Sequence, residues 1–156
     1  MESEEIQLFL HVTAAIVALG VTFVWPFLMP FAERQGVAAT KLIHRFYMFL
    51  DKYLVIPGAA LVFLFGLGLV FSEDHLREDP PAWLWASIIW FVAAFVVAAI
   101  VQRPLIASAA RTLEGADDSG ELPAAYRPAA RRAQIVGMLL ALSVVAITFL
   151  MTVRPS

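Results

Sequence analysis

Four long apolar segments constrain the fold of this chain more than any other feature. They run over about residues 6–31, 53–71, 83–101 and 135–153. A helix needs roughly 20 mostly apolar residues to cross a bilayer, and each segment is about that long or longer. None carries the charged outer stripe expected of a helix in a soluble bundle. We predict an all-α polytopic membrane protein, a single antiparallel bundle of four transmembrane helices over residues 1–156, in contact with the lipid bilayer.

Composition supports this prediction and excludes several functions. The chain is 61% hydrophobic, more than a soluble protein of its size can bury. It has no cysteine, which excludes disulfides, thiolate metal sites and iron–sulfur clusters. Its net charge of −2 gives no sign of a nucleic-acid partner. No nucleophile–base set, phosphate-binding loop or metal-ligand spacing stands out, so the sequence identifies no catalytic residue.

The distribution of lysine and arginine predicts the orientation of the bundle, because both residues favour the cytoplasmic side of a membrane. The first and third connections, with their edges, carry most of the basic residues: Arg34, Lys41, Arg45, Lys52, Arg103, Arg111, Arg127, Arg131 and Arg132. We therefore expect these two connections in the cytoplasm and both termini outside. The N-terminal sequence MESEE is acidic, unlike a secretory signal, so the first segment is expected to remain in the mature protein.

Local signals suggest how the segments join and pack. From Gly36 to Lys52, apolar and basic residues alternate, which favours an amphipathic helical stretch before the second span, with Thr40 as a candidate cap. His44 lies on this stretch and is expected among the lipid headgroups. Asp51 and Lys52 are expected to form an interfacial pair, and a cytoplasmic polar patch of Asp51, Lys52 and Arg103 is the alternative. Small residues of the second span are expected to face the bundle interior and allow close helix packing: Gly58, Ala59, Ala60, Gly66 and Gly68.

His11 is the sharpest candidate for a functional residue. One side of the first segment is marked by residues spaced three or four apart: Gln7, His11, Ala15, Ala18, Thr22 and Trp25. His11 therefore lies inside a predicted membrane span, on the face with small residues. An ionisable group is costly at such a place, and its presence marks a functional site by default.

Antiparallel helices bring four further residues to about the depth of His11: Gly66, Gly68, Ser87 and Met151. This set suits a b-type haem, whose iron takes a histidine ligand and is completed by methionine or a second histidine. The two glycines would let the macrocycle approach the backbone, and Gln7 would fix the imidazole tautomer by a hydrogen bond. Three alternatives stay open: His11 hydrogen-bonds a neighbouring helix through Ser87 or Thr148, it transfers protons, or it binds another ligand.

Three stretches also carry a resemblance to a known group of proteins. They are FLHVTAAIVALG at residues 9–20, YLVIPGAALVFLFGLGLV at 53–70, and VRP near the C-terminus. With them the chain resembles small bacterial four-helix membrane proteins, a group that includes HemJ-type protoporphyrinogen oxidases, CopD-type copper-resistance membrane domains and a related uncharacterised family.

The resemblance implies that His11 corresponds to the early histidine that ligates haem in HemJ-type proteins. The essential lysine of those oxidases has no counterpart, since residues 83–90 read WLWASIIW and place Ser87 near its position. The uncharacterised branch is therefore favoured over the oxidase branch, in the bacterial cytoplasmic (inner) membrane.

These observations lead to three functional hypotheses. The first is an accessory or redox-linked membrane protein that binds haem b through His11, with haem carrying the chemistry. The second is a structural or assembly subunit without a cofactor, which docks other membrane subunits or forms a homo-oligomer through its small-residue faces and amphipathic stretch. The third is a HemJ-like protoporphyrinogen oxidase with another partner for His11.

Overall fold

The computed structural model describes residues 3–154, except for the side chains of Ser3, Asp74 and His75. The described part of the chain contains helices and connections and no strand. The elements are α1 (Ser3–Gln35), α2 (Val37–Leu50), η1 (Asp51–Val55), α3 (Ile56–Ser72), α4 (Asp74–Glu78), α5 (Ala82–Val97), η2 (Ala98–Gln102), α6 (Arg103–Thr112) and α7 (Tyr126–Val153), where η1 and η2 are π-helical turns. The all-α prediction is thus confirmed.

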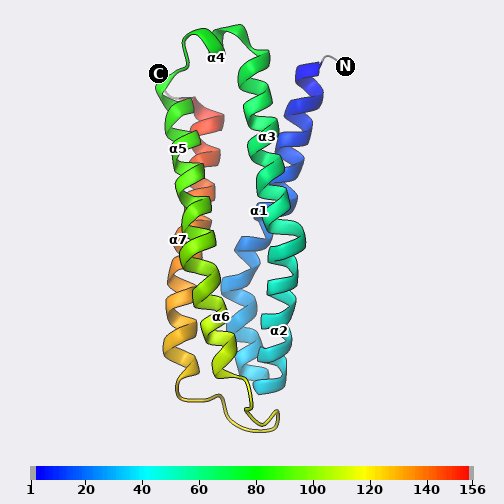
Figure 1. Ribbon diagram of the computed structural model, residues 1–156, viewed down its shortest axis with the longest axis vertical. Coiled ribbons are helices and arrows are strands. Elements are labelled where there is room, and N and C mark those ends of the chain that lie inside the picture. Colours follow the sequence, from blue (N-terminus) through cyan, green and yellow to red (C-terminus); the bar gives the residue numbers. More distant parts are fainter. Residues whose placement is uncertain (1–2, 155–156) are drawn as a thin grey trace.

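These elements form four rods, each long and apolar enough to cross a membrane. The rods are Glu4–Gln35, Val37–Ser72, Ala82–Thr112 and Tyr126–Val153. The second rod joins α2, η1 and α3 without a break, and the third joins α5, η2 and α6 in the same way (Figure 1). Both termini lie at the end of the bundle that carries α4, and residues 113–125 connect α6 to α7 at the opposite end (Figure 1).

The rods are longer than the apolar segments from which they were predicted. The amphipathic stretch is α2, which continues the second rod inward. The third rod ends at Thr112, beyond the predicted residue 101, and the fourth rod begins at Tyr126, before the predicted residue 135. The added residues mix apolar side chains with polar and basic ones, so the helices continue beyond the purely apolar sequence. Thr40 is not a cap: it lies inside α2, where its Oγ1 donates to the carbonyl of Gly36 at 2.8 Å.

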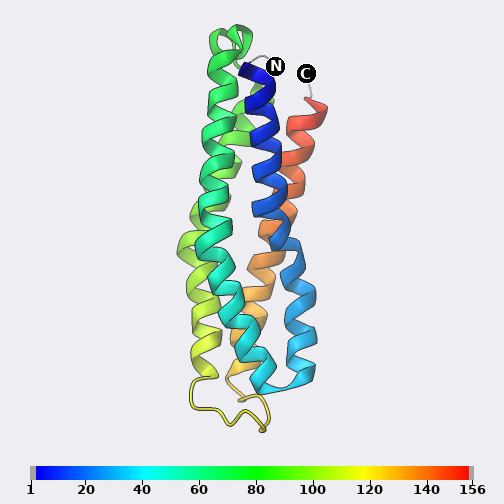
Figure 2. The same cartoon turned by 90° about the vertical axis from the view of Figure 1, so that its right-hand side faces the viewer.

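The rods pack as two pairs joined along α1 and α7. α1 packs on α3 along its outer half and on α2 along its inner half, and α5 and α6 pack on α7 (Figures 1 and 2). α1 stays helical through Pro26 and Pro30 and bends about midway (Figure 2), since each proline removes one intrahelical hydrogen bond. Stacked rings of Phe63 and Phe91, with centroids 6.2 Å apart, link α3 to α5.

A cluster of buried side chains lies in the inner half of the bundle. Its members are Trp25, Met29, Ala109, Leu113 and Tyr126. Elsewhere many large apolar side chains face outward, among them Phe27 at 79% exposed and Ile100 at 69%. A soluble protein does not expose apolar surface on this scale, so these faces contact lipid.

Candidate functional site

Three glycines of α3 make room for three side chains of α1. A Cβ on Gly58 would overlap that of Ala18, and one on Gly68 would overlap the Oε1 of Gln7. At Gly66 the ideal Cβ position lies 2.9 Å from Cε1 of His11 and 3.1 Å from its Nδ1. The expectation that these glycines face the bundle interior is confirmed, because each lies against α1. Small residues let the helices approach, as membrane helix packing requires.

The imidazole of His11 is anchored to α3 by a hydrogen bond. Its Nδ1 lies 2.8 Å from the carbonyl oxygen of Val62, in a partly buried position. A carbonyl only accepts, so Nδ1 carries the proton and donates it. In the neutral ring Nε2 is then the nitrogen with a free lone pair. The open alternative of a hydrogen bond to a neighbouring helix is therefore realised, but through a backbone carbonyl of α3 and not through Ser87 or Thr148.

Gln7 lies one turn outward from His11 on the same face of α1. Its Nε2 donates to Oγ of Ser72 at 3.2 Å, and that hydroxyl donates to the carbonyl of Gly68 at 3.0 Å. The side chain reaches Ser72 because Gly68 leaves space for it. The role expected of Gln7, fixing the tautomer of His11, is carried out by the carbonyl of Val62.

The space beside Gly66 and Gly68 is filled by His11 and Gln7. A flat macrocycle therefore has no room against these two glycines, contrary to the expectation from the sequence. The physical reason is that α1 and α3 pack directly on each other. The space that glycine leaves on α3 is therefore occupied by side chains of α1.

Ser87 and Met151 belong to the other pair of rods. Ser87 on α5 is fully buried, and its hydroxyl donates to the carbonyl of Trp83 at 2.8 Å. Met151 is partly buried on α7, which packs on α5. The structure thus brings together four of the six predicted site residues, Gln7, His11, Gly66 and Gly68, at the α1–α3 contact. The remaining two belong to α5 and α7, which pack on each other.

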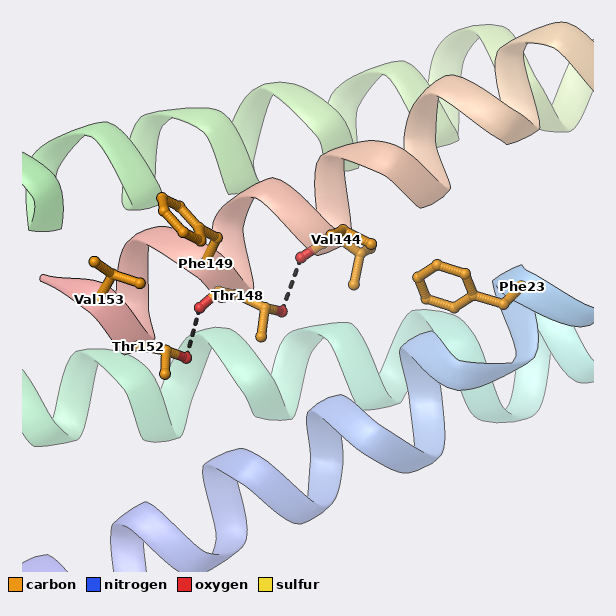
Figure 3. A pocket seen from close by; sticks show the side chains of 7 residues that line it. Phe23, Val144, Thr148, Phe149, Thr152 and Val153 are labelled. Carbon is orange, nitrogen blue, oxygen red and sulfur yellow. Dashed lines mark hydrogen bonds between the residues drawn. The ribbon is translucent and has the colours of Figure 1, made fainter.

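An open groove of about 430 Å³ runs between α1 and the outer part of α7 (Figure 3). It is lined by Phe23, Val144, Val145, Thr148, Phe149, Thr152 and Val153. The hydroxyls of Thr148 and Thr152 donate to carbonyls of their own helix, at 2.8 and 2.7 Å. The groove therefore presents mainly hydrocarbon and suits an apolar occupant.

A second polar cluster lies near the inner end of the bundle, around His44. This side chain is 3% exposed, so the expectation that it lies among the headgroups is wrong. Its Nε2 lies 3.2 Å from the hydroxyl of Tyr126, which donates to Oε1 of Glu33 at 3.0 Å. The ring also packs edge-on against Trp25, with centroids 5.6 Å apart. Three elements, α1, α2 and α7, meet at this cluster.

The sequence held one signal for this cluster. In α2, Val37, Thr40 and His44 are spaced three and four residues apart, and these three residues are the buried ones of that helix. The basic residues between them led to the prediction that this helix face lies at the membrane surface. The partner Tyr126 lies in the segment before the fourth apolar run, where the sequence predicted no helix.

An ion pair ties the second rod to the third, between the start of η1 and the residue that follows η2. Arg103 Nε lies 2.8 Å from Oδ2 of Asp51, whose side chain is 13% exposed. Lys52 lies over the ring of Tyr53, 5.1 Å from its centroid. Asp51 therefore pairs across helices with Arg103, whereas the sequence suggested a pair with Lys52 within the same helix.

The connection between α6 and α7 is held to α2 by a lysine. Lys41 donates to the carbonyl of Ala116 and to Oδ1 of Asp118, both at 2.7 Å. Beside it, hydrogen bonds from the side chain and backbone of Ser119 lower the pKa of the Asp117 carboxyl. These contacts order a segment that the sequence alone marks as polar and turn-rich.

The fold and its apolar surface define an integral membrane protein with four transmembrane helices. The chain belongs to the family DUF2269, described as predicted integral membrane protein, whose model matches residues 5–155. Comparison with curated proteins and with solved structures gives no match.

Proposed function

We propose that this protein binds haem b in the bacterial cytoplasmic membrane, in an accessory, redox-linked role, and that His11 would hold the haem iron. The observation that carries the proposal is the hydrogen bond from His11 Nδ1 to Val62. It leaves Nε2 as a lone-pair donor held in a fixed orientation. Metal-ligating histidines typically donate their other ring N–H in this way to a carboxylate, a carbonyl or water.

The donor chemistry of this region fits a haem iron. The Cβ position of Gly66 is 2.9 Å from Cε1 of His11 but 3.9 Å from Nε2, so Nε2 is directed away from this point of α3. Met151 on α7 and Ser87 on α5 stay candidates for further contacts to the bound haem. When bound, haem would supply one-electron redox chemistry, while Val62, Gly66 and Gln7 position and pack the ligand side chain.

The resemblance to HemJ-type proteins supports His11 as the ligand, because it matches their haem-ligating histidine. The absence of their essential lysine near Ser87 argues against oxidase activity. The assembly-subunit hypothesis loses part of its support, since Gly58, Gly66 and Gly68 are already used against α1. These glycines are therefore not free to dock another subunit.

We also propose that both termini face the outside of the cell. The two ends of the chain lie at one end of the bundle, and the basic connections lie at the other (Figure 1). Because the chain has no cysteine, Ser119→Cys gives a single label site. An impermeant maleimide should react with it only after the cells are permeabilised; reaction in intact spheroplasts would invert the proposed orientation.

The test of haem binding is an absorption spectrum of the protein purified in detergent from haem-sufficient bacteria. We expect a Soret band and reduced-minus-oxidised bands in the wild type, and their loss in His11→Ala. The matched control is His44→Ala, which removes a histidine at the other end of the bundle and should keep the bands. A well-folded wild type without these bands, or an unchanged spectrum in His11→Ala, would contradict the proposal.

A further inference from the structure

The hydrogen bonds around His44 have a direction that follows from elementary chemistry. The carboxylate of Glu33 only accepts, so the single hydroxyl proton of Tyr126 is donated to Oε1 of Glu33. The phenolic oxygen must then accept from His44, which places a proton on Nε2. In the neutral ring Nδ1 is therefore an acceptor with a free lone pair. The cluster is a polarised chain that runs from His44 through Tyr126 to Glu33.

The acceptor Nδ1 of His44 is buried and has no hydrogen-bond partner among the described residues. A buried polar atom without a partner is costly, so such an atom usually marks an unseen water or ligand. His44 lines a cavity of about 20 Å³ whose wall also includes Glu33, Tyr126 and Gln134. About 10–15 Å³ is enough for one water molecule, and these polar side chains supply the partners it needs.

We propose that Glu33, Tyr126 and His44, with one water in this cavity, form a proton-transfer site at the inner end of the bundle. Nδ1 of His44 takes a proton from the cavity water when solvent has protonated that water to hydronium, and neutral water is left in the cavity. Nε2 passes its proton to the oxygen of Tyr126, whose own proton moves to Oε1 of Glu33. One proton enters, one leaves through the partly exposed carboxyl of Glu33, and each N–H or O–H bond broken is matched by one formed.

The surroundings of the site favour transfer along this one path. α1 contributes Trp25, Met29 and Glu33, α7 contributes Tyr126, Ala130, Ala133 and Gln134, and α2 contributes His44 itself. Tyr47 of α2 packs on Trp25, with ring centroids 4.0 Å apart. α6 adds Ala109 to the buried cluster, and the connection after it adds Leu113. Glu33 and Tyr126 are thus the titratable groups hydrogen-bonded in line with His44, and the neighbouring groups are apolar, amide or aromatic.

The test measures proton exchange at His44 in the full chain in lipid nanodiscs, labelled with ¹⁵N-histidine. The chain has three histidines, so His11→Ala and His75→Ala assign the signals. We expect the Nε2–H tautomer, an Nδ1 signal shifted by an accepted hydrogen bond, and rapid exchange of Nε2–H with bulk deuterium despite its burial. Glu33→Gln and Tyr126→Phe should slow this exchange about a hundredfold, as for removal of a positioned acid–base group.

Matched control variants distinguish proton transfer through Tyr126 and Glu33 from a general change in the stability of the fold. Glu121→Gln and Tyr53→Phe make the same chemical changes at exposed positions outside the His44 cluster, and both should leave the exchange rate unchanged. Slow exchange in the wild type, or an Nδ1–H tautomer, would overturn the proposal even if a variant failed to fold. Equal effects of Glu33→Gln and Glu121→Gln would also overturn it.

Discussion

At the scale of single residues, glycines of α3 decide where the polar side chains of α1 lie. The spacing of Gln7, His11 and Ala18 predicts that they share one face of a helix, and the structure places all three against α3. The sequence could not show that the partner of His11 is the backbone carbonyl of Val62, because any residue supplies such an acceptor. The sequence also could not show that Gly66 and Gly68 leave space for His11 and Gln7 and not for a macrocycle.

Replacing Gly66 by alanine should displace the imidazole of His11. The added Cβ would lie 2.9 Å from Cε1 and 3.1 Å from Nδ1, and the ring cannot retreat without breaking its bond to Val62. We expect a loss of about 1–3 kcal/mol, the usual cost of overpacking. Thermal unfolding in detergent measures the change.

Gly20→Ala on α1 is the control, since nothing lies within 4 Å of the added Cβ. It should be neutral or stabilise the helix by up to about 1 kcal/mol. Equal destabilisation by the two substitutions would show that the α1–α3 contact is looser than described.

At the scale of elements, two π-helical turns are linked by one ion pair. Asp51 begins η1, and Arg103 directly follows η2. A π turn often marks a functional or strained place in a helix, and here one occurs in the second rod and one in the third. The sequence revealed the charges but not their pairing, which depends on how the second and third rods lie side by side.

Arg103→Gln should destabilise the protein because it leaves the mostly buried carboxylate of Asp51 without its partner. We expect a loss of about 1.5–3 kcal/mol, the range for hydrogen bonds to charged groups. Arg127→Gln alters an exposed arginine near the same end of the bundle and should cost less than about 1 kcal/mol.

The double variant Asp51→Asn with Arg103→Gln should recover much of this loss, because no charge is then left unpaired. Unfolding of the single and double variants in one detergent gives the comparison. If Arg103→Gln and Arg127→Gln behaved alike, the ion pair would not stabilise the bundle.

At the scale of the whole molecule, the sequence predicts the class of fold well and the arrangement of the helices poorly. Apolar runs of membrane-spanning length are visible in the residues themselves, so four spans with both termini at one end could be predicted. Rod lengths were underestimated because helices continue into basic sequence that hydropathy does not detect. The burial of His44 depends on Tyr126 and Glu33 from distant segments, so it needs the tertiary structure.

The pairing of α1 with α3 around His11 is the central claim, and crosslinking in native membranes tests it most directly. Gln7→Cys and Ser72→Cys are placed together in the cysteine-free chain, where the native side chains lie 3.2 Å apart. A short thiol-specific crosslinker should join them, as detected by mass spectrometry of the digested protein. Phe9→Cys with Ser72→Cys is the control, since Phe9 is 64% exposed on another face of α1. Preferential crosslinking of Gln7→Cys is the predicted result; equal crosslinking of the two pairs, or none at Gln7→Cys, would contradict the account.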